Sequence, residues 1–201
     1  MRVTNRQRVA ITENNSETKL SDEELYLRFL DGDADAAEEL IALHGQGLIL
    51  FIYGIVKDMF YAEELMIEAF ARMMVKGGKF RGESSLKTWL YAIGRNLALS
   101  HLKKHRHEKH VSLDAIYDTG GTGTSQSSEA LYLLEEEKLS LYEAMQTLKY
   151  EHREAVHLVY FENMSYEDAG KVLGKTRKQI DSLVSYAKAK LKSRLEMERG
   201  T

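Results

Sequence analysis

The chain has 201 residues, of which 43% are hydrophobic and 29% charged, a balance that is ordinary for a globular protein. It has no cysteine, which excludes disulfides and thiolate metal sites, and no proline, which leaves long helices uninterrupted. The longest apolar run, residues 48–56, is too short to cross a bilayer, and the polar start lacks a signal-peptide core. We therefore expect a cytoplasmic protein without membrane insertion.

The net charge of −3 conceals an alternation of acidic and basic blocks. Residues 20–68 hold 2 basic and 12 acidic residues, whereas residues 76–110 hold 9 basic and 2 acidic ones and four histidines. The same order recurs with an acidic block over residues 111–170 and a basic block over residues 171–201. Basic blocks suit phosphate-bearing partners, and solvated helix faces are the alternative interpretation of such charge runs.

The first half of the chain predicts an arm followed by helices. Residues 1–19 are polar and are expected to form a flexible N-terminal arm. Ser21 and Glu24 have the spacing of a capping box, which predicts a helix start, and Asp31-Gly32-Asp33 is expected to end that helix. The further helices expected in this half cover residues 34–43, 44–57 and 61–76, and a long helix capped by Ser84 or Ser85 that runs to about Lys104.

A stretch of small polar residues separates this half from the second. Residues 111–130 include a run of Gly, Thr and Ser and predict a flexible linker. Beyond it, helices are expected over residues 129–148 and 151–162. No segment alternates with strand period for long. The predicted fold is therefore all-α, with two small helical domains over residues 20–110 and 131–201 joined by the linker.

The end of the chain predicts a helix-turn-helix. Residues 165–174 form a short amphipathic helix that ends at Gly174, and a basic segment over residues 175–194 follows directly, with Thr176 as its N-cap. The second helix of such a motif enters the major groove of DNA. A helical hairpin that serves only for packing is the alternative interpretation.

The first basic block adds a second nucleic-acid signal. Residues 79–104 combine aromatic residues, arginines, lysines and a flexible loop, a mixture that suits single-stranded DNA. Trp89 shares a helical stripe with Leu90, Ile93 and Leu97, so we expect it mainly to anchor the helix beneath the loop.

Three segments in this order resemble the extracytoplasmic-function (ECF) group of bacterial sigma factors. They are A-E-E-L-M-I-E-A-F-A-R-M at residues 62–73, the stretch that opens with F-R-G-E at residues 80–104, and S-Y-E-D-A-G-K-V-L-G at residues 165–174. The resemblance covers residues 21–195 apart from the linker. It implies a factor that directs core RNA polymerase to promoters and helps to melt the DNA, with no catalytic residue and no cofactor.

The resemblance also implies partners and site residues. The partners are core RNA polymerase through its β′ clamp and β flap, promoter DNA, and an anti-sigma factor. The acidic helix would dock on the clamp with Glu64, Leu65, Glu68, Phe70 and Arg72. The minus-ten element would be melted by Phe80, Arg81, Gly82, Glu83, Ser84, Lys87, Trp89, Asn96, Lys103 and Lys104. The minus-thirty-five element would be read by Tyr166, Arg177, Lys178, Gln179, Ser182, Ser185 and Lys188.

The sequence departs from the family pattern at several positions. Ile67 stands where a Gln is common, and Ser100 where an Asp is common. Asp181 and Leu183 stand where the recognition helix usually has basic residues. Asp181 would repel phosphate unless it is paired, for example with Arg177 or Lys178 one turn back.

Parts of the sequence are compatible with two other functions. A free-standing helix-turn-helix regulator is the alternative to the sigma factor, but a duplex reader needs no loop for unstacked bases. A hydrolase or metal site would use the histidine cluster, yet a solvated helix end is the expected role of these residues, and no nucleophile–base arrangement is present, so no enzyme is expected. The cluster consists of His101, His105, His107 and His110.

Overall fold

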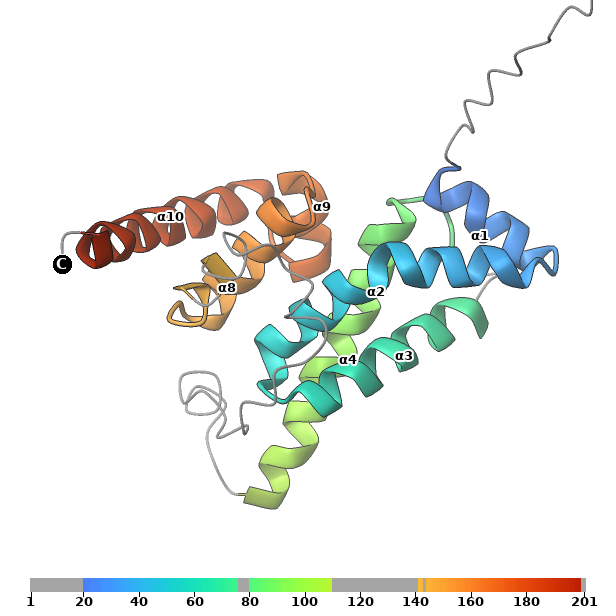
Figure 1. Cartoon of the computed structure of the whole chain (residues 1–201), viewed down its shortest axis with the longest axis horizontal. Helices are drawn as coiled ribbons and strands as arrows, with labels where there is room; N and C mark the ends of the chain where they lie inside the picture. Colours follow the sequence, from blue (N-terminus) through green and yellow to red (C-terminus); the bar gives the residue numbers. More distant parts are fainter. Residues whose placement is uncertain (1–19, 76–79, 110–140, 143, 200–201) are drawn as a thin grey trace, which may run out of the picture.

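The structure is a computed structural model that describes residues 20–75, 80–109, 141–142 and 144–199, with the backbone alone for residues 106–109 and 194–199. These described residues form helices and no strand (Figure 1). The N-terminal bundle consists of α1 (Asp22–Leu30), α2 (Ala34–Val56), α3 (Met59–Val75) and α4 (Leu86–Lys109). The C-terminal group consists of α8 (Tyr150–Val156), the π-helical turn η2 (His157–Phe161), α9 (Tyr166–Leu173) and α10 (Arg177–Arg199).

The helix starts follow the capping chemistry that the sequence predicts. The Glu24 backbone N–H donates to Ser21 Oγ at 3.2 Å, and the Ser21 N–H donates to Glu24 Oε2 at 2.8 Å, which completes the capping box of α1. At α4 the cap is Ser85, whose Oγ accepts from the Thr88 N–H at 3.1 Å. The loop that precedes α4 is therefore held at its C-terminal end by the helix cap.

Residues 34–57 were expected to form two helices, and this prediction was wrong. They form the single 23-residue helix α2, which ends at Lys57 in the left-handed conformation. The glycines near the expected break do not interrupt it, because Gly45 and Gly47 lie where the helix meets its neighbours. A Cβ on Gly47 would overlap the Glu162 carboxylate and would lie 2.7 Å from Tyr91 Oη.

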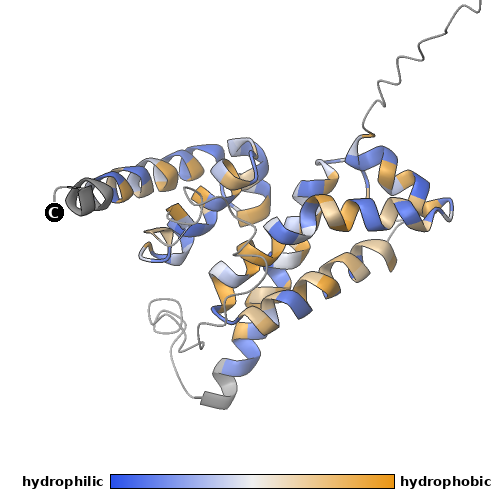
Figure 2. Cartoon of the chain, in the orientation of Figure 1, coloured by the Kyte–Doolittle hydropathy of each residue, from blue (hydrophilic) through white to orange (hydrophobic). Residues whose placement is uncertain are grey.

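Helix α2 is the central helix of the bundle. It is the one helix in the described parts of the chain whose length and hydropathy would permit a membrane span. Half of that stretch is buried inside the structure, however, and Leu40, Leu48 and Ile52 are fully buried. Hydrophobic residues gather where α2, α3 and α4 meet (Figure 2). The apolar character of α2 is thus that of a core helix.

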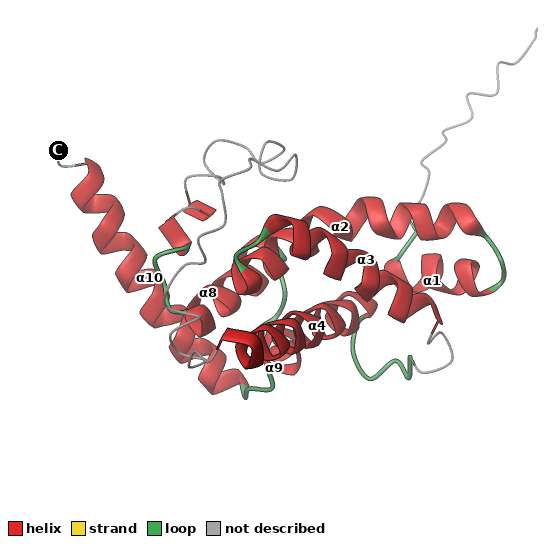
Figure 3. Ribbon diagram, turned by 90° about the horizontal axis from the view of Figure 1, so that it is seen from below, coloured by secondary structure: helices red, strands yellow, loops and turns green. Residues whose placement is uncertain are grey.

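The two groups of helices pack directly on each other. One hydrophobic core joins Leu90 and Leu97 of α4 to Leu173, Ile180 and Val184 of the C-terminal group. Helix α9 lies against α4, and α8 and η2 contact α2 (Figure 3). The whole predicted linker, residues 111–130, lies outside the described residues, so the domain boundaries stay a prediction.

The predicted helix over residues 151–162 is present but changes its winding. It begins as α8 and continues as η2, where the Glu162 N–H donates to the His157 carbonyl at 3.1 Å across five residues. Such wide turns commonly mark functional positions. Because of this turn, the N-terminal bundle is bordered by His157, Phe161 and Glu162. Of the predicted helix over residues 129–148, most lies outside the described residues.

Candidate nucleic-acid interface

The helix-turn-helix is built by a cap, a tight turn and a close backbone approach. Ser165 caps α9 by accepting from the Asp168 N–H at 3.0 Å. Gly174 ends α9 with φ at +65°, as the sequence predicted, because glycine adopts this conformation without steric cost. A Cβ on Gly170 would lie 2.5 Å from the Lys175 carbonyl oxygen, so this glycine allows α9 to approach the turn closely.

The first turn of α10 is partly occupied by contacts within the motif. Thr176 and Gln179 form a capping box in which the Gln179 carboxamide oxygen accepts from the Thr176 N–H at 2.8 Å. Gln179 was predicted to contact DNA, and its side-chain oxygen is instead committed to the cap. Arg177 Nε lies 3.3 Å from Glu167 Oε1, so one of the two cations expected to offset Asp181 pairs with another carboxylate.

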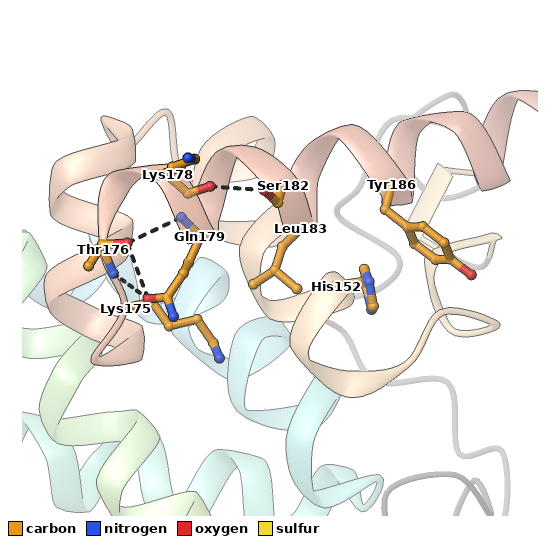
Figure 4. Close-up of a pocket in the computed structure, with 8 residues that line it drawn as sticks. All are labelled: His152, Lys175, Thr176, Lys178, Gln179, Ser182, Leu183 and Tyr186. Atoms are coloured by element: carbon orange, nitrogen blue, oxygen red, sulfur yellow. Dashed lines mark hydrogen bonds between the residues drawn. The ribbon is translucent and has the colours of Figure 1, made fainter.

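The exposed positions of α10 define the surface that remains for a ligand. Lys178, Asp181, Ser182 and Ser185 are all exposed, and within the described residues Asp181 forms no ion pair. Ser182 Oγ donates to the Lys178 carbonyl at 3.1 Å, which leaves its lone pairs outward. The surface beside these residues is hollowed between α8 and α10 (Figure 4). Its lining consists of His152, Lys175, Thr176, Lys178, Gln179, Ser182, Leu183 and Tyr186.

Two further predicted residues of the motif, Tyr166 and Lys188, have different surroundings. Tyr166 is half-buried and packs on the shared core. Lys188 Nζ lies 4.7 Å from the centre of the Tyr160 ring, and a hydrogen bond to Tyr160 raises the pKa of Lys188. This lysine therefore stays charged near the exposed end of the recognition surface.

The described part of the loop before α4, from Phe80 to Ser85, presents the cation Arg81 and rests on an aromatic anchor. Arg81 and Glu83 are exposed, and Gly82 has φ at +69°. Phe80 was expected to join the loop in holding a base, but its ring packs at 5.4 Å from Trp89 and 5.9 Å from Tyr26. Phe80 and Trp89 thus anchor the loop to α1 and α4. The neighbouring Ser84 is half-buried.

Helix α4 carries its cations on two different surfaces. Asn96, Lys103 and Lys104 are exposed to solvent. By contrast, Lys87 and Arg95 lie under the C-terminal group, where Lys87 Nζ is 2.8 Å from Glu162 Oε2 and Arg95 Nε is 2.7 Å from Glu154 Oε1. Lys87, which the resemblance assigned to the minus-ten element, therefore lies in an ion pair with the C-terminal group.

The carboxylates opposite these cations have shifted pKa values. Burial would raise the pKa of Glu162, but the hydrogen bond and charge of His157, together with Lys87, lower it to about 2. Burial raises the pKa of Glu154 although Arg95 hydrogen-bonds to it. Arg95 was not among the predicted site residues. Its partner is 59 residues away in the sequence, and only its place in the segment over residues 79–104 signalled a role.

Helix α3 turns an acidic and apolar surface to solvent. Glu64 and Glu68 are exposed, and Ile67 and Phe60 are each 63% exposed. The predicted contact residues Leu65 and Phe70 are instead buried, because they lie on the stripe that α3 packs into the bundle core. Arg72 Nε donates to Glu68 Oε1 at 3.0 Å. The exposed apolar pair was missed because isolated surface hydrophobics carry no sequence pattern.

The histidines at the end of α4 stack on a tyrosine. The rings of His101 and His105 are 4.2 Å apart, and Tyr61 lies 4.3 Å from His101. Burial and the neighbouring His105 lower the pKa of His101. In the described parts of the chain, no group of three His, Cys, Asp or Glu residues could hold a metal ion. The side chains of His107 and His110 lie outside the described residues.

The comparisons with known families match both groups of helices. The family model for sigma-70 region 2 matches residues 40–108, and that for sigma-70 region 4 matches residues 144–193. The match to region 2 argues against a free-standing helix-turn-helix regulator, since such a regulator would need only the second unit.

Curated relatives and solved structures agree with the family models. The chain is 30% identical over 162 residues to the RNA polymerase sigma-H factor of Pseudomonas aeruginosa, which covers 78% of this chain and 84% of the relative. It is 32% identical over 147 residues to the RNA polymerase sigma factor CarQ of Myxococcus xanthus, covering 73% and 82%. It is 33% identical over 137 residues to the ECF RNA polymerase sigma factor EcfG of Rhodopseudomonas palustris, covering 68% and 72%.

Among solved structures, the sigma factor RpoE in complex with the anti-sigma factor NepR from Bartonella quintana matches with a TM-score of 0.59 and 25% identity, covering 79% of this chain and 96% of that one. CnrH, solved in complex with the cytosolic domain of CnrY, matches with a TM-score of 0.61 at 19% identity, covering 88% and 97%, and so supports the fold. The all-α fold and the resemblance noted in the sequence are thereby confirmed. The chain belongs to the extracytoplasmic-function group of RNA polymerase sigma factors, the proteins that direct transcription initiation to specific promoters.

Proposed function

We propose that three surfaces of this sigma factor divide the work of initiation. The outer face of α3, with Glu64, Ile67 and Glu68, binds the β′ clamp of core RNA polymerase. An acidic, partly apolar face of this kind suits a basic partner, because complementary charge steers the encounter and fixes the register. The apolar Ile67 supplies contact area that charge alone does not.

The loop at Arg81 and the exposed side of α4 hold the melted minus-ten element. The observation that supports this most directly is the exposure of Arg81 in a loop anchored by Phe80, together with the exposure of Asn96, Lys103 and Lys104 further along α4. Cations can follow the backbone of an unpaired strand, while the loop receives a base whose extrusion costs a few kcal/mol of stacking. No catalytic residue is needed for this step, because binding to the open strand supplies the free energy.

Helix α10 reads the minus-thirty-five element as duplex DNA. Lys178, Ser182 and Ser185 offer the side chains that reach base edges, and Lys188 offers a phosphate contact. Because Asp181 is exposed and carries a negative charge, the isolated helix binds weakly. Specificity then comes from two weak modules on one chain that engage one promoter together.

The partners of this chain are core RNA polymerase, promoter DNA and an anti-sigma factor, and its place of action is the cytoplasm. The anti-sigma factor is supported by the complex in which RpoE, a protein of the same fold, was solved with the anti-sigma factor NepR. The family models for sigma-70 region 2 and region 4 both match this chain. This supports the proposal that each of the two regions contacts both polymerase and DNA.

Run-off transcription with purified core enzyme tests the division of surfaces. Glu64→Ala with Glu68→Ala should abolish promoter-specific transcripts by weakening polymerase binding, whereas Glu38→Ala with Glu39→Ala, an exposed acidic pair on α2, should not. Equal activity of the two pairs would contradict the role of α3. Binding of the variants to core enzyme, measured by fluorescence anisotropy, separates a docking defect from a melting defect.

A further inference from the structure

The carboxylates around the recognition helix α10 differ in whether a cation neutralises them. Three of them are paired within the helix-turn-helix and the helix that precedes it. Asp181, by contrast, is exposed on α10 and forms no ion pair with any residue that the structure describes. The three pairs are Glu151–Lys175, Glu167–Arg177 and Asp168–Lys171, with N–O distances of 2.8, 3.3 and 3.7 Å.

Asp181 lies on the face of α10 that points away from the protein core. Residues three and four positions apart share one face of a helix, so Asp181 lies on the same face as the exposed Lys178 and Ser185. Ile180 and Val184 are fully buried on the opposite face. Asp181 is therefore held toward a ligand of α10 rather than toward the protein.

The side chains on this face differ in length along the helix. Asp181, Ser182 and Ser185 are short and lie in the middle, whereas the long cations Lys178 and Lys188 lie on either side of them along the chain. Short side chains let the helix approach the base edges closely, and long cations can reach the phosphates that border the groove. A carboxylate in the middle of this face therefore meets base edges, where some groups donate hydrogen bonds.

We propose that Asp181 selects a cytosine in the minus-thirty-five element by accepting a hydrogen bond from the N4 amino group of that base. The inference rests on the proposed role of α10 as the reader of this element. In the major groove cytosine presents a donor, guanine and thymine present acceptors, and adenine presents a donor beside the acceptor N7. Because an ionised carboxylate only accepts hydrogen bonds, cytosine is the base that suits it without an opposing acceptor.

The selection arises as much from rejection as from attraction. Guanine or thymine at this position would place a carbonyl oxygen against the carboxylate, which would lose its bound water and gain no donor in return. Lys178 lies three positions earlier on the same face, and its ammonium group can donate to O6 and N7 of the guanine that pairs with the selected cytosine. The two side chains together match one C·G pair.

This role also gives a physical reason for a negative charge on a surface that binds DNA. Asp181 repels the phosphates of every sequence and so lowers the affinity of α10 for DNA in general. At the correct cytosine, the charge-assisted hydrogen bond offsets that repulsion. The carboxylate therefore makes binding weaker and more selective at the same time.

Selection of promoters from a randomised duplex library tests this assignment. The full-length chain is bound to core enzyme, and the DNA that the holoenzyme retains is sequenced. The wild type should prefer cytosine over guanine and thymine by about tenfold at one position of the minus-thirty-five element. Asp181→Ala should lose this preference at that position alone, while its general affinity for DNA stays equal or rises.

Asp181→Asn provides a sharper test than loss of the preference. A carboxamide can accept from N6 of adenine and donate to N7, so this variant should change the preferred base at the same position from cytosine to adenine. The matched control is Glu167→Gln, which removes one charge from the same motif and frees Arg177 for phosphate. The control should change the affinity for all sequences alike and keep the cytosine.

The base preferences decide between the outcomes. Unchanged preferences in both Asp181 variants would overturn the inference, as would a uniform change in affinity like that of the control. Circular dichroism checks that each variant keeps the helix content of the wild type. A wild-type holoenzyme that selects no minus-thirty-five sequence would contradict the proposed role of α10 itself, whereas a selected sequence that does not respond to Asp181 would overturn this inference alone.

Discussion

Arg95 and Glu154 form a two-point ion pair across the boundary between the two groups of helices, with N–O distances of 2.7 and 3.2 Å. The pair joins the helix assigned to promoter melting to the helix that precedes the helix-turn-helix. Because such a pair depends on orientation as well as charge, it fixes how the two regions meet. The packing of the two regions against each other is therefore set in part by this contact.

Glu162 should make the stability of the closed protein depend on pH. Its pKa is lowered to about 2 from a reference of 4.5, so its contribution is fully present above pH 4.5 and is lost as the pH falls through 2. Between pH 5 and pH 3, the stability advantage of the wild type over Glu162→Gln should shrink by about 2 kcal/mol. Urea unfolding at each pH measures this, and a constant difference would contradict the ion pair.

Lys57 should destabilise the packed protein at neutral pH, and this penalty should shrink as the pH rises. Burial, with Arg153 nearby, lowers the pKa of Lys57 to about 7 from 10.5, so the packed protein disfavours its proton. This penalty is full below pH 7 and fades as the pH rises toward 10.5, so stability should rise by roughly 1–2 kcal/mol between pH 7 and pH 9. Lys57→Met should remove that rise. An identical pH profile in the variant would show that Lys57 is solvated.

The turn of the helix-turn-helix should tolerate a methyl group at one glycine and not at the other. Gly174 has no neighbour within 4 Å of an added Cβ, so Gly174→Ala should cost only the left-handed conformation, about 1 kcal/mol. Gly170→Ala places the Cβ against the Lys175 carbonyl, which should cost up to about 3 kcal/mol and shift α9 relative to α10.

Thermal unfolding and run-off transcription together check this pair. Gly170→Ala should lose promoter-specific transcripts, while Gly174→Ala should retain them with a slightly lower melting temperature. If both variants lost the same stability, the close approach at Gly170 would have no energetic consequence.

The cap of α9 should contribute measurably to the stability of the protein. Ser165→Ala removes the acceptor for the Asp168 N–H and should cost about 1 kcal/mol. Ser185→Ala, an exposed serine within α10, should change the stability by less than about 0.5 kcal/mol. Comparable losses in the two variants, measured by urea unfolding, would argue against a structural cap at Ser165.

Local signals in the sequence predicted local structure well. The capping box at Ser21, the left-handed stop at Gly174 and the N-cap at Thr176 are all present, because each depends on residues a few positions apart. The single helix over residues 34–56 was missed, because its glycines serve packing against distant residues rather than a break in the helix.

The sequence predicted only those parts of the site that depend on local composition and spacing. Exposed residues such as Arg81, Asn96 and Lys178 follow from composition and spacing. The sequence could not show that Leu65 is buried in the bundle or that Lys87 meets Glu162, 75 residues away. Both depend on tertiary packing, which brings together positions that share no local pattern.

The most direct test of the assigned melting surface is permanganate reactivity of promoter thymines in the reconstituted holoenzyme. Arg81→Ala with Asn96→Ala should leave core binding intact and abolish the reactivity at the minus-ten element, whereas Arg28→Ala, an exposed arginine on α1, should match the wild type. Full reactivity at the same thymines in the double variant would contradict the account.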